Sequence, residues 1–329
     1  MNGIQEYDKN YSNKIKNIIA EHKDLKGYYA FLSDKSQSTI YSYLFHIGSF
    51  MTYVGKPLDK FDFDDFADYL AKSKYTNKGN ISTQQYRITV YHSLKSFGKY
   101  LVAKGILHKN PMDSIDRPKS KDSQSTIVKR NNGYLSKEEI NILLYNVKNG
   151  CGNELSIKKQ EKWRNRDNAI IMILLNTGIR CSALYKLDIA SVMLDENKIL
   201  VTDKGGYAKY KIISDATVEA IEKWISERDE ILSGTQCEAL FISNQKKRLT
   251  VRSIENIVKK YTENISGKNI SPHKLRATFG TQLYQQTKDI HFVQKAMDHK
   301  SADTTASYIR GKDSVSNKAS DIMEKLLQI

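Results

Sequence analysis

The sequence predicts a mainly helical protein with one small β-sheet, arranged as two domains. The length of 329 residues exceeds what one ordinary core needs and suits two. Apolar residues recur every three or four positions through most of the chain, which is the spacing of helices with one buried face. One pair of short strand-like segments near residue 205 is the exception and predicts a hairpin in the second domain.

Residues 1–109 predict a small bundle of helices. The last of them begins after Ser82 or Thr83, either of which can cap it, and stops near Gly105. The apolar stripes of the bundle lie at 15–32, 40–54, 63–70 and 86–101. Their spacing predicts four helices around one core.

Residues 110–133 are predicted to link the two domains. Helical periodicity disappears there, and Pro111 and Pro118 appear among several serines. The segment is also cationic, through Arg117, Lys119, Lys121, Lys129 and Arg130. Such a charge run most often only solvates its segment, and the alternative is that it lies along DNA phosphates.

The second domain, residues 134–329, opens with a helix. Ser136 and Glu139 form a capping box before an apolar stripe that ends near Gly150. Further helical stripes lie at 218–225, 254–261 and 275–283. The domain is therefore expected to be α+β, with helices in the majority.

A buried helix is predicted over 169–175, where almost every residue is apolar. Gly178 ends it and leaves Arg180 at its mouth. A buried helix would hold this arginine in one place.

A hairpin is predicted around Lys204-Gly205-Gly206. The flanking runs 199–202 and 210–213 have strand composition. Lys204 is therefore expected at the turn.

The charge balance of 52 Lys and Arg against 37 Asp and Glu gives +15, which favours a polyanionic partner. An anionic membrane or solubility alone would also account for the charge.

Cys151, Cys181 and Cys237 are odd in number and lack paired ligand spacing, so neither a disulfide framework nor a zinc site is expected. No signal pattern or membrane-span length of apolar residues is seen, so a cytoplasmic, nucleoid-associated protein is expected.

Ser271-Pro272-His273 predicts the start of a helix, with Ser as the cap and Pro at the first position. His273 and Arg276 then share one face. Free N–H groups at a helix start favour anions, and the planar arginine fork suits phosphate. The pair is either a phosphate site or a capping pair on a solvated helix.

Four ordered segments resemble the tyrosine recombinases, also called the phage integrase family. They are Thr177-Gly178-Ile179-Arg180, Lys204-Gly205-Gly206, Ser271 to Arg276, and His299 with Tyr308 nine residues later. The resemblance covers the chain from about residue 135 by motif, and the bundle before it is similar to the family's core-binding domain by pattern only. It implies a SAM-like N-terminal bundle and an α+β catalytic domain.

The resemblance implies that Tyr308 attacks the scissile phosphate, giving a 3′-phosphotyrosine and a free 5′-hydroxyl. Arg180 and Arg276 would clamp the non-bridging oxygens, and His299 would hydrogen-bond a phosphate oxygen or position Tyr308. One phosphodiester replaces another, so no nucleotide cofactor or metal ion is expected. By residue type alone the sequence leaves open Tyr185, Tyr207 and Tyr284.

The proton transfers are also implied by the resemblance. A phenol with an ordinary pKa near 10 needs a base, and His273 is the candidate. Lys204 would be the general acid for the leaving 5′-oxygen, with Lys209 and Lys211 as less suitable substitutes.

Three positions depart from the family's pattern: Ala183 stands where an acidic residue is usual, Ala277 where His or a polar residue is common, and Asp298 where Gly normally precedes His299. None removes a reacting group. Asp298 is expected to slow the reaction by attracting His299 or by adding negative charge near the phosphate, and Ala183 removes a supporting contact.

The function implied is site-specific recombination of double-stranded DNA by four subunits on two sites, through a Holliday junction. A monomer is left open for the DNA-free protein, and mobility of a DNA element is the preferred setting. An apolar stripe over about 313–329 predicts a terminal helix with one buried face. Such a stripe usually packs within its own chain, whereas the resemblance implies that this helix packs into a neighbouring subunit. The alternatives are a type IB topoisomerase and a non-catalytic DNA-binding protein, and a His-based metallonuclease is weaker because its ligand spacing is missing.

Overall fold

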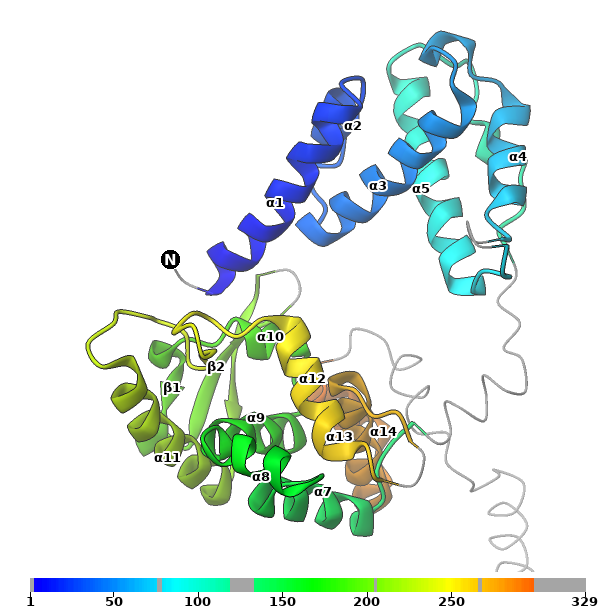
Figure 1. The fold of residues 1–329 in the computed structure, drawn as a ribbon. Coiled ribbons are helices and arrows are strands. Elements are labelled where there is room, and N and C mark those ends of the chain that lie inside the picture. The colour runs from blue at the N-terminus through cyan, green and yellow to red at the C-terminus, as the bar shows by residue number, and fades with distance from the viewer. Residues whose placement is uncertain (1–2, 76–78, 119–132, 204–205, 266–267, 299–329) are drawn as a thin grey trace, which may run out of the picture. The chain divides into compact units, whose positions relative to one another are not determined.

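The protein divides into two compact units, which are described separately (Figure 1). The structure is a computed structural model that describes residues 3–75, 79–118, 133–203, 206–265 and 268–298. The N-terminal unit spans Ile4–Asp122, and the C-terminal unit begins at Ser123. Both are mainly helical and the second carries a small antiparallel sheet, which confirms the predicted fold class. None of the helices described in these ranges is long and apolar enough to span a bilayer.

The first predicted helix of the N-terminal unit is wrong in one respect, because its stripe belongs to two helices. The chain turns after His22, whose carbonyl accepts a hydrogen bond from Leu25 N at 3.0 Å. Ile15 and Leu25, on either side of the turn, are buried in one cluster, so the turn lets both helices reach the same core. The helices are α1 (Gly3–Glu21), α2 (Leu25–Phe31), α3 (Gln37–Val54), α4 (Phe63–Lys72) and α5 (Gln84–Ala103).

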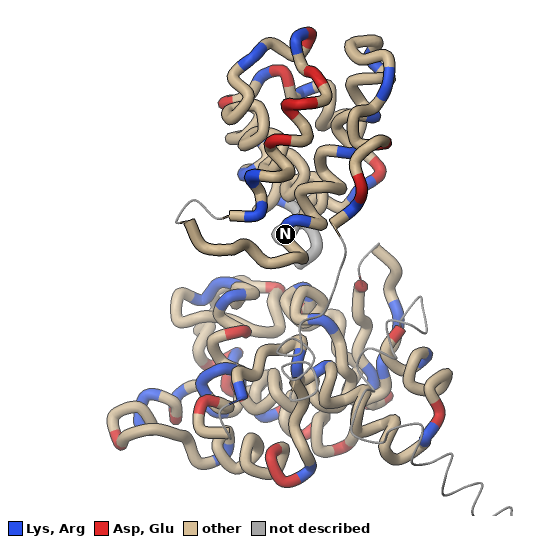
Figure 2. Tube along the Cα trace, turned by 90° about the vertical axis from the view of Figure 1, so that its right-hand side faces the viewer, with Lys and Arg blue, Asp and Glu red and all other residues tan. Residues whose placement is uncertain are grey.

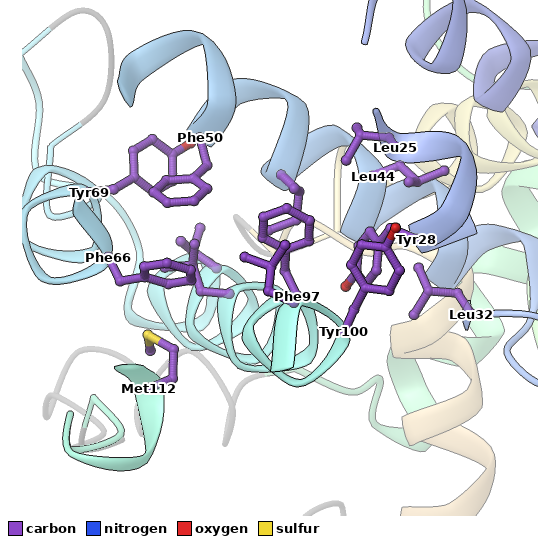
Figure 3. Close-up of a cluster of buried hydrophobic side chains, with 14 of the residues drawn as sticks. Leu25, Tyr28, Leu32, Leu44, Phe50, Phe66, Tyr69, Phe97, Tyr100 and Met112 are labelled. Atoms are coloured by element: carbon purple, nitrogen blue, oxygen red, sulfur yellow. The ribbon is translucent and has the colours of Figure 1, made fainter. Parts of the chain in front are cut away.

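Aromatic rings dominate the core of this unit (Figure 3). Phe50 of α3 packs on Phe66 of α4 with ring centroids 4.9 Å apart. Phe97 of α5 meets Tyr28 of α2 edge-on at 5.1 Å. Such pairs add about 0.5 to 1.5 kcal/mol beyond the area they bury. The rings therefore join four helices in one core.

The packed part of the N-terminal unit continues past residue 109, where the sequence places the linker. Asn110 accepts a hydrogen bond from Met112 N at 3.1 Å and donates one to Lys95 O at 3.0 Å. Met112 is fully buried beneath α5 (Figure 3). Gly98 makes the approach possible, because a Cβ there would lie 2.0 Å from the Asn110 side chain.

The C-terminal unit surrounds one central helix, α9 (Arg164–Thr177), which packs against α7, α11 and α13. The other helices are α7 (Lys137–Asn149), α8 (Glu154–Glu161), α10 (Cys181–Tyr185), α11 (Asp215–Leu232), α12 (Val251–Thr262), α13 (Pro272–Thr287) and α14 (Ile290–Ala296). The sheet has the order β1-β2-β3, with strands Val192–Met193, Lys198–Thr202 and Ala208–Ile212, all antiparallel. The predicted hairpin is β2–β3, and Thr202 pairs with Ala208 at its turn end.

A buried carboxylate holds the start of α9. Asp167 is fully buried, and its Oδ1 accepts hydrogen bonds from Arg166 Nε at 2.9 Å and Nη2 at 2.8 Å. Its Oδ2 accepts from Lys260 Nζ at 2.7 Å and from Tyr261 Oη at 3.0 Å, both on α12. One side chain therefore ties α9 to α12.

Asp167→Ala is expected to destabilise the C-terminal unit by about 3 to 5 kcal/mol, because it leaves a buried arginine without its carboxylate. For a unit of this size that corresponds to a fall in Tm of roughly 10 °C, measurable by scanning calorimetry of the full chain. Glu219→Ala is the control, since its ion pair with Lys223 joins two exposed side chains and should contribute no more than about 1 kcal/mol. Equal Tm changes in the two variants would contradict the structural role of Asp167.

Candidate active site

The net charge of +15 is spread over the molecule and is not confined to one site. Lys and Arg occur on both units, with Asp and Glu interspersed (Figure 2). Charge alone therefore does not locate the active site, and the arrangement of individual side chains has to do so.

Arg180 is positioned by the turn that ends α9. Gly178 adopts a left-handed backbone with φ of 59°, and a Cβ there would meet the Phe279 ring at 2.3 Å. Arg180 follows as the N-cap residue of α10, in an extended conformation. Its guanidinium forms an ion pair with Asp203, and the arginine side chain is 36% exposed. The arginine is thus fixed at its backbone and reachable at its tip.

Arg276 lies one turn into α13 and is buried. It donates hydrogen bonds to the carbonyl oxygens of Gly178 and Met297. Both acceptors are uncharged. Gly178 directly follows α9 and Met297 directly follows α14, so the two hydrogen bonds connect the ends of these helices. The arginine therefore links the elements that form the pocket.

His273 lies on the first turn of α13, where Ser271 is the N-cap residue and Pro272 the first helical residue. The residue is exposed. The protein packed around it nevertheless lowers its pKa below the ordinary value of 6.5, and the positive charges of Arg276 and Arg180 lower that pKa further. The neutral form, which can accept a proton, is therefore favoured at neutral pH.

The β2–β3 hairpin brings further charged groups to the same place. Asp203 closes its turn by donating from N to Tyr207 O at 3.1 Å and accepting at O from Gly206 N at 3.2 Å. On β3, Lys209 and Lys211 both reach a carboxylate that follows α14. Asp203 thus orders the turn and also engages Arg180.

One pocket collects the two arginines, Asp203 and the two lysines, whereas His273 is not among its lining residues. It is lined by Ile179, Arg180, Ala183, Val201, Asp203, Lys209, Lys211, Arg276 and Asp298. The segments that supply them lie far apart in the sequence: the α9–α10 turn, the hairpin, α13 and the end of α14. Across the part of the chain that is described, no group of three or more His, Cys, Asp and Glu side chains is placed to hold a metal ion.

Of the six predicted site residues, the structure places Arg180 and Arg276 in one pocket and His273 near enough for both charges to act on its imidazole. The other three, Lys204, His299 and Tyr308, lie outside the described residues, as does the predicted terminal helix over 313–329.

Sequence reasoning missed two features of the site. No spacing pattern singles out Asp203 as the partner of Arg180, although it directly precedes Lys204. The carboxylate of Asp298 is engaged by Lys209 and Lys211, two contacts that no pattern in the sequence predicts.

Comparisons with known proteins point in one direction. A family model described as the phage integrase family matches residues 134–314, more than half of the chain. Tyrosine recombinase XerC of Caldanaerobacter subterraneus subsp. tengcongensis is 27% identical over 316 residues, covering 89% of this chain and 83% of that protein. Tyrosine recombinase XerC of Serratia marcescens is 30% identical over 220 residues, covering 66% of this chain and 65% of that protein.

Solved structures share the fold. The XerH site-specific recombinase bound to palindromic difH substrate, in a post-cleavage complex, has a TM-score of 0.68 at 21% identity, covering 95% of this chain and 89% of that chain. A lambda integrase dimer bound to a COC′ core site has a TM-score of 0.61 at 19% identity, covering 89% of this chain and 97% of that chain.

Proposed function

The chain belongs to the phage integrase family and is a site-specific tyrosine recombinase, and we propose that it cuts and rejoins DNA through a 3′-phosphotyrosyl bond at Tyr308. The observation that carries the proposal is the pocket in which Arg180 and Arg276 lie together, beside the hairpin that bears Lys204. Two guanidiniums, with a lysine-bearing hairpin beside them, suit the binding of a phosphodiester.

The two arginines have different tasks in this proposal. Arg276 is held by two carbonyl oxygens and presents a fixed positive charge. Arg180 is paired with Asp203, and a DNA phosphate would replace that carboxylate. Negative charge grows on the non-bridging oxygens as the phosphorus gains a fifth oxygen, so donors already in place stabilise the transition state.

Two protons move in the reaction. The Tyr308 phenol loses one as its oxygen bonds to phosphorus, and His273 accepts it. The 5′-oxygen gains one as its bond to phosphorus breaks, and Lys204 donates it. One phosphodiester is exchanged for another, so the reverse reaction rejoins the strand without a nucleotide.

The lowered pKa of His273 predicts a pH profile for this step. The rate of adduct formation should be steady at neutral pH and fall only below the ordinary histidine pKa of 6.5, because protonation begins there. His273→Gln should slow the reaction and remove this acid limb, measured as single-turnover rates at saturating DNA. An acid limb that persists unchanged in the variant would assign the base to another group.

The assembly is proposed from relatives. A lambda integrase tetramer has been solved bound to a Holliday junction, with a TM-score of 0.61 at 17% identity. We propose that this chain likewise acts as four subunits on two duplex sites in the cytoplasm, with its N-terminal unit on core DNA and its predicted terminal helix in a neighbouring subunit. Integration, resolution and inversion would use the same residues.

The test is covalent capture followed by strand exchange. A nicked duplex carrying the site, or a pool of DNA flanking the gene, should give a protein–DNA adduct that survives denaturation. Recombinant products between two sites would then exclude plain supercoil relaxation, the type IB topoisomerase alternative. Failure to form the adduct on DNA that the protein binds would favour a non-catalytic DNA-binding protein.

A further inference from the structure

Asp298 occupies a backbone position that favours glycine. Its φ of 52° is left-handed, which costs a residue with a side chain roughly 1 to 2 kcal/mol, although Asp tolerates it better than most. Met297, directly before it, is buried, and a Cβ on Gly280 would meet its sulfur at 2.4 Å. Arg276 binds the Met297 carbonyl. A strained and closely packed backbone therefore fixes the position from which the Asp298 side chain extends. Such strain is typical of functional positions.

The carboxylate of Asp298 holds one strand of the hairpin at two points. Lys209 Nζ lies 2.9 Å from Oδ1, and Lys211 Nζ lies 2.6 Å from Oδ2. These lysines are two residues apart on β3 and so share one face of the strand. Lys211 also donates to Ala296 O at 2.7 Å. The contacts pin β3 to the end of α14.

The pair of contacts is partly shielded from water. The side chains of Asp298 and Lys211 are 19% and 16% exposed, whereas that of Lys209 is 54% exposed. Burial by itself would raise the pKa of the Asp298 carboxyl, but the hydrogen bonds from Lys211 and Lys209 outweigh it and the pKa is lowered. The group therefore stays ionised and keeps both contacts at neutral pH.

Ala183 lines the same pocket but offers no acceptor. It lies on α10, three residues after Arg180, and is 2% exposed. Its methyl group cannot balance the cations around it, at the position where the resemblance to the family leads us to expect an acid. Asp298 also lines this pocket. The two departures from the family's pattern, a lost acid and a gained one, thus meet in space.

We propose that Asp298 is a positioning residue. Through Lys209 and Lys211 it holds the β2–β3 hairpin against the pocket, and it supplies from the end of α14 the carboxylate that Ala183 lacks. The inference rests on the proposed function, because the hairpin bears the expected general acid, Lys204. It reverses the sign of the earlier expectation, in which the negative charge of Asp298 slows the reaction.

The first experiment measures single-turnover adduct formation by wild type and Asp298→Gly. Glycine adopts a φ of 52° without strain, so a lower rate cannot come from a newly strained backbone. We expect a rate 10- to 100-fold lower, about the loss seen when a supporting contact of an active site is removed. Asp195→Gly, which removes an exposed carboxylate between β1 and β2, matches the change in net charge and should keep the wild-type rate. An Asp298→Gly rate equal to or above wild type would overturn the proposal.

The second experiment asks whether the loss acts through the general acid. In a substrate whose leaving 5′-oxygen is replaced by sulfur, the tyrosine–phosphorus bond forms and the phosphorus–sulfur bond breaks. The thiolate leaves without a proton, since a thiol is far more acidic than an alcohol. Asp298→Gly should cleave this substrate at the wild-type rate. A rate that stays low would mean a general structural defect and would reject the link to the hairpin.

The third experiment restores a carboxylate to the pocket at position 183. Ala183→Glu combined with Asp298→Gly should recover most of the lost rate on the ordinary substrate. If the double variant keeps the wild-type Tm but does not recover the rate, the idea that a carboxylate at position 183 can replace the one at position 298 is rejected. If wild type itself forms no adduct on bound DNA, the proposed function fails and this inference fails with it. If wild type forms the adduct and only the Asp298 results differ from those expected, the inference fails and the proposed function stands.

Discussion

Tyr308→Phe is expected to abolish the denaturation-resistant protein–DNA adduct while leaving DNA affinity unchanged. The phenylalanine keeps the ring but has no oxygen to bond to phosphorus, so the loss is complete where other site variants give partial losses. Affinity depends mainly on cations that meet phosphates, and none is altered. The measurement is adduct formation on a nicked suicide duplex, with binding followed in parallel by gel shift.

The structure supplies the controls for this test. Tyr185 is buried, and the centroid of its ring lies 5.6 Å from the guanidinium carbon of Arg248, so it is poorly placed to reach DNA. Tyr207 is 69% exposed at the hairpin turn, close to the pocket. It is the more demanding control, because an exposed tyrosine there could itself reach the phosphate. Tyr207→Phe should keep the adduct. An adduct that persists in Tyr308→Phe and disappears in Tyr207→Phe would move the nucleophile to the hairpin.

Long elements with a buried face could be predicted because their pattern is local. The run 169–175 is apolar on every side and is indeed the buried centre of α9. The hairpin followed from two strand-like runs around a glycine pair. In contrast, β1 has two residues and α10 has five, so neither is long enough to show a period. Their existence depends on pairing and packing with distant segments.

The same distinction applies to the site. Arg180 and Arg276 could be found because each belongs to a motif of neighbouring residues. The pairing of Asp203 with Arg180 depends on how the hairpin packs beside α10, which no local pattern reports. Asp298 was noticed as a departure, but its meaning required the positions of Lys209 and Lys211 across the fold. Residue types could be predicted, whereas the partners of each charge could not.

Arg276→Ala is expected to lower the rate of adduct formation about 10²- to 10³-fold, the cost of removing one donor to a developing charge. It should also destabilise the C-terminal unit, since the buried carbonyls of Gly178 and Met297 each lose a donor, at about 1 to 3 kcal/mol per group. The two effects are measured separately, as single-turnover rates and as Tm. Arg252→Ala, whose side chain is 80% exposed on α12, should change neither.

Arg276→Lys separates the two roles of this residue. A lysine keeps the positive charge but presents a single ammonium, which cannot replace a fork that binds two carbonyls and still faces a phosphate. We therefore expect a rate closer to Arg276→Ala than to wild type. Replacing the leaving oxygen by sulfur should rescue neither variant, because in the proposed mechanism the arginine stabilises charge on the non-bridging oxygens and donates no proton to the leaving group. Rescue by sulfur would instead place Arg276 with the hairpin in the proton-transfer step. The proposal that arginines bind the non-bridging oxygens while Lys204 alone protonates the leaving oxygen would then be wrong.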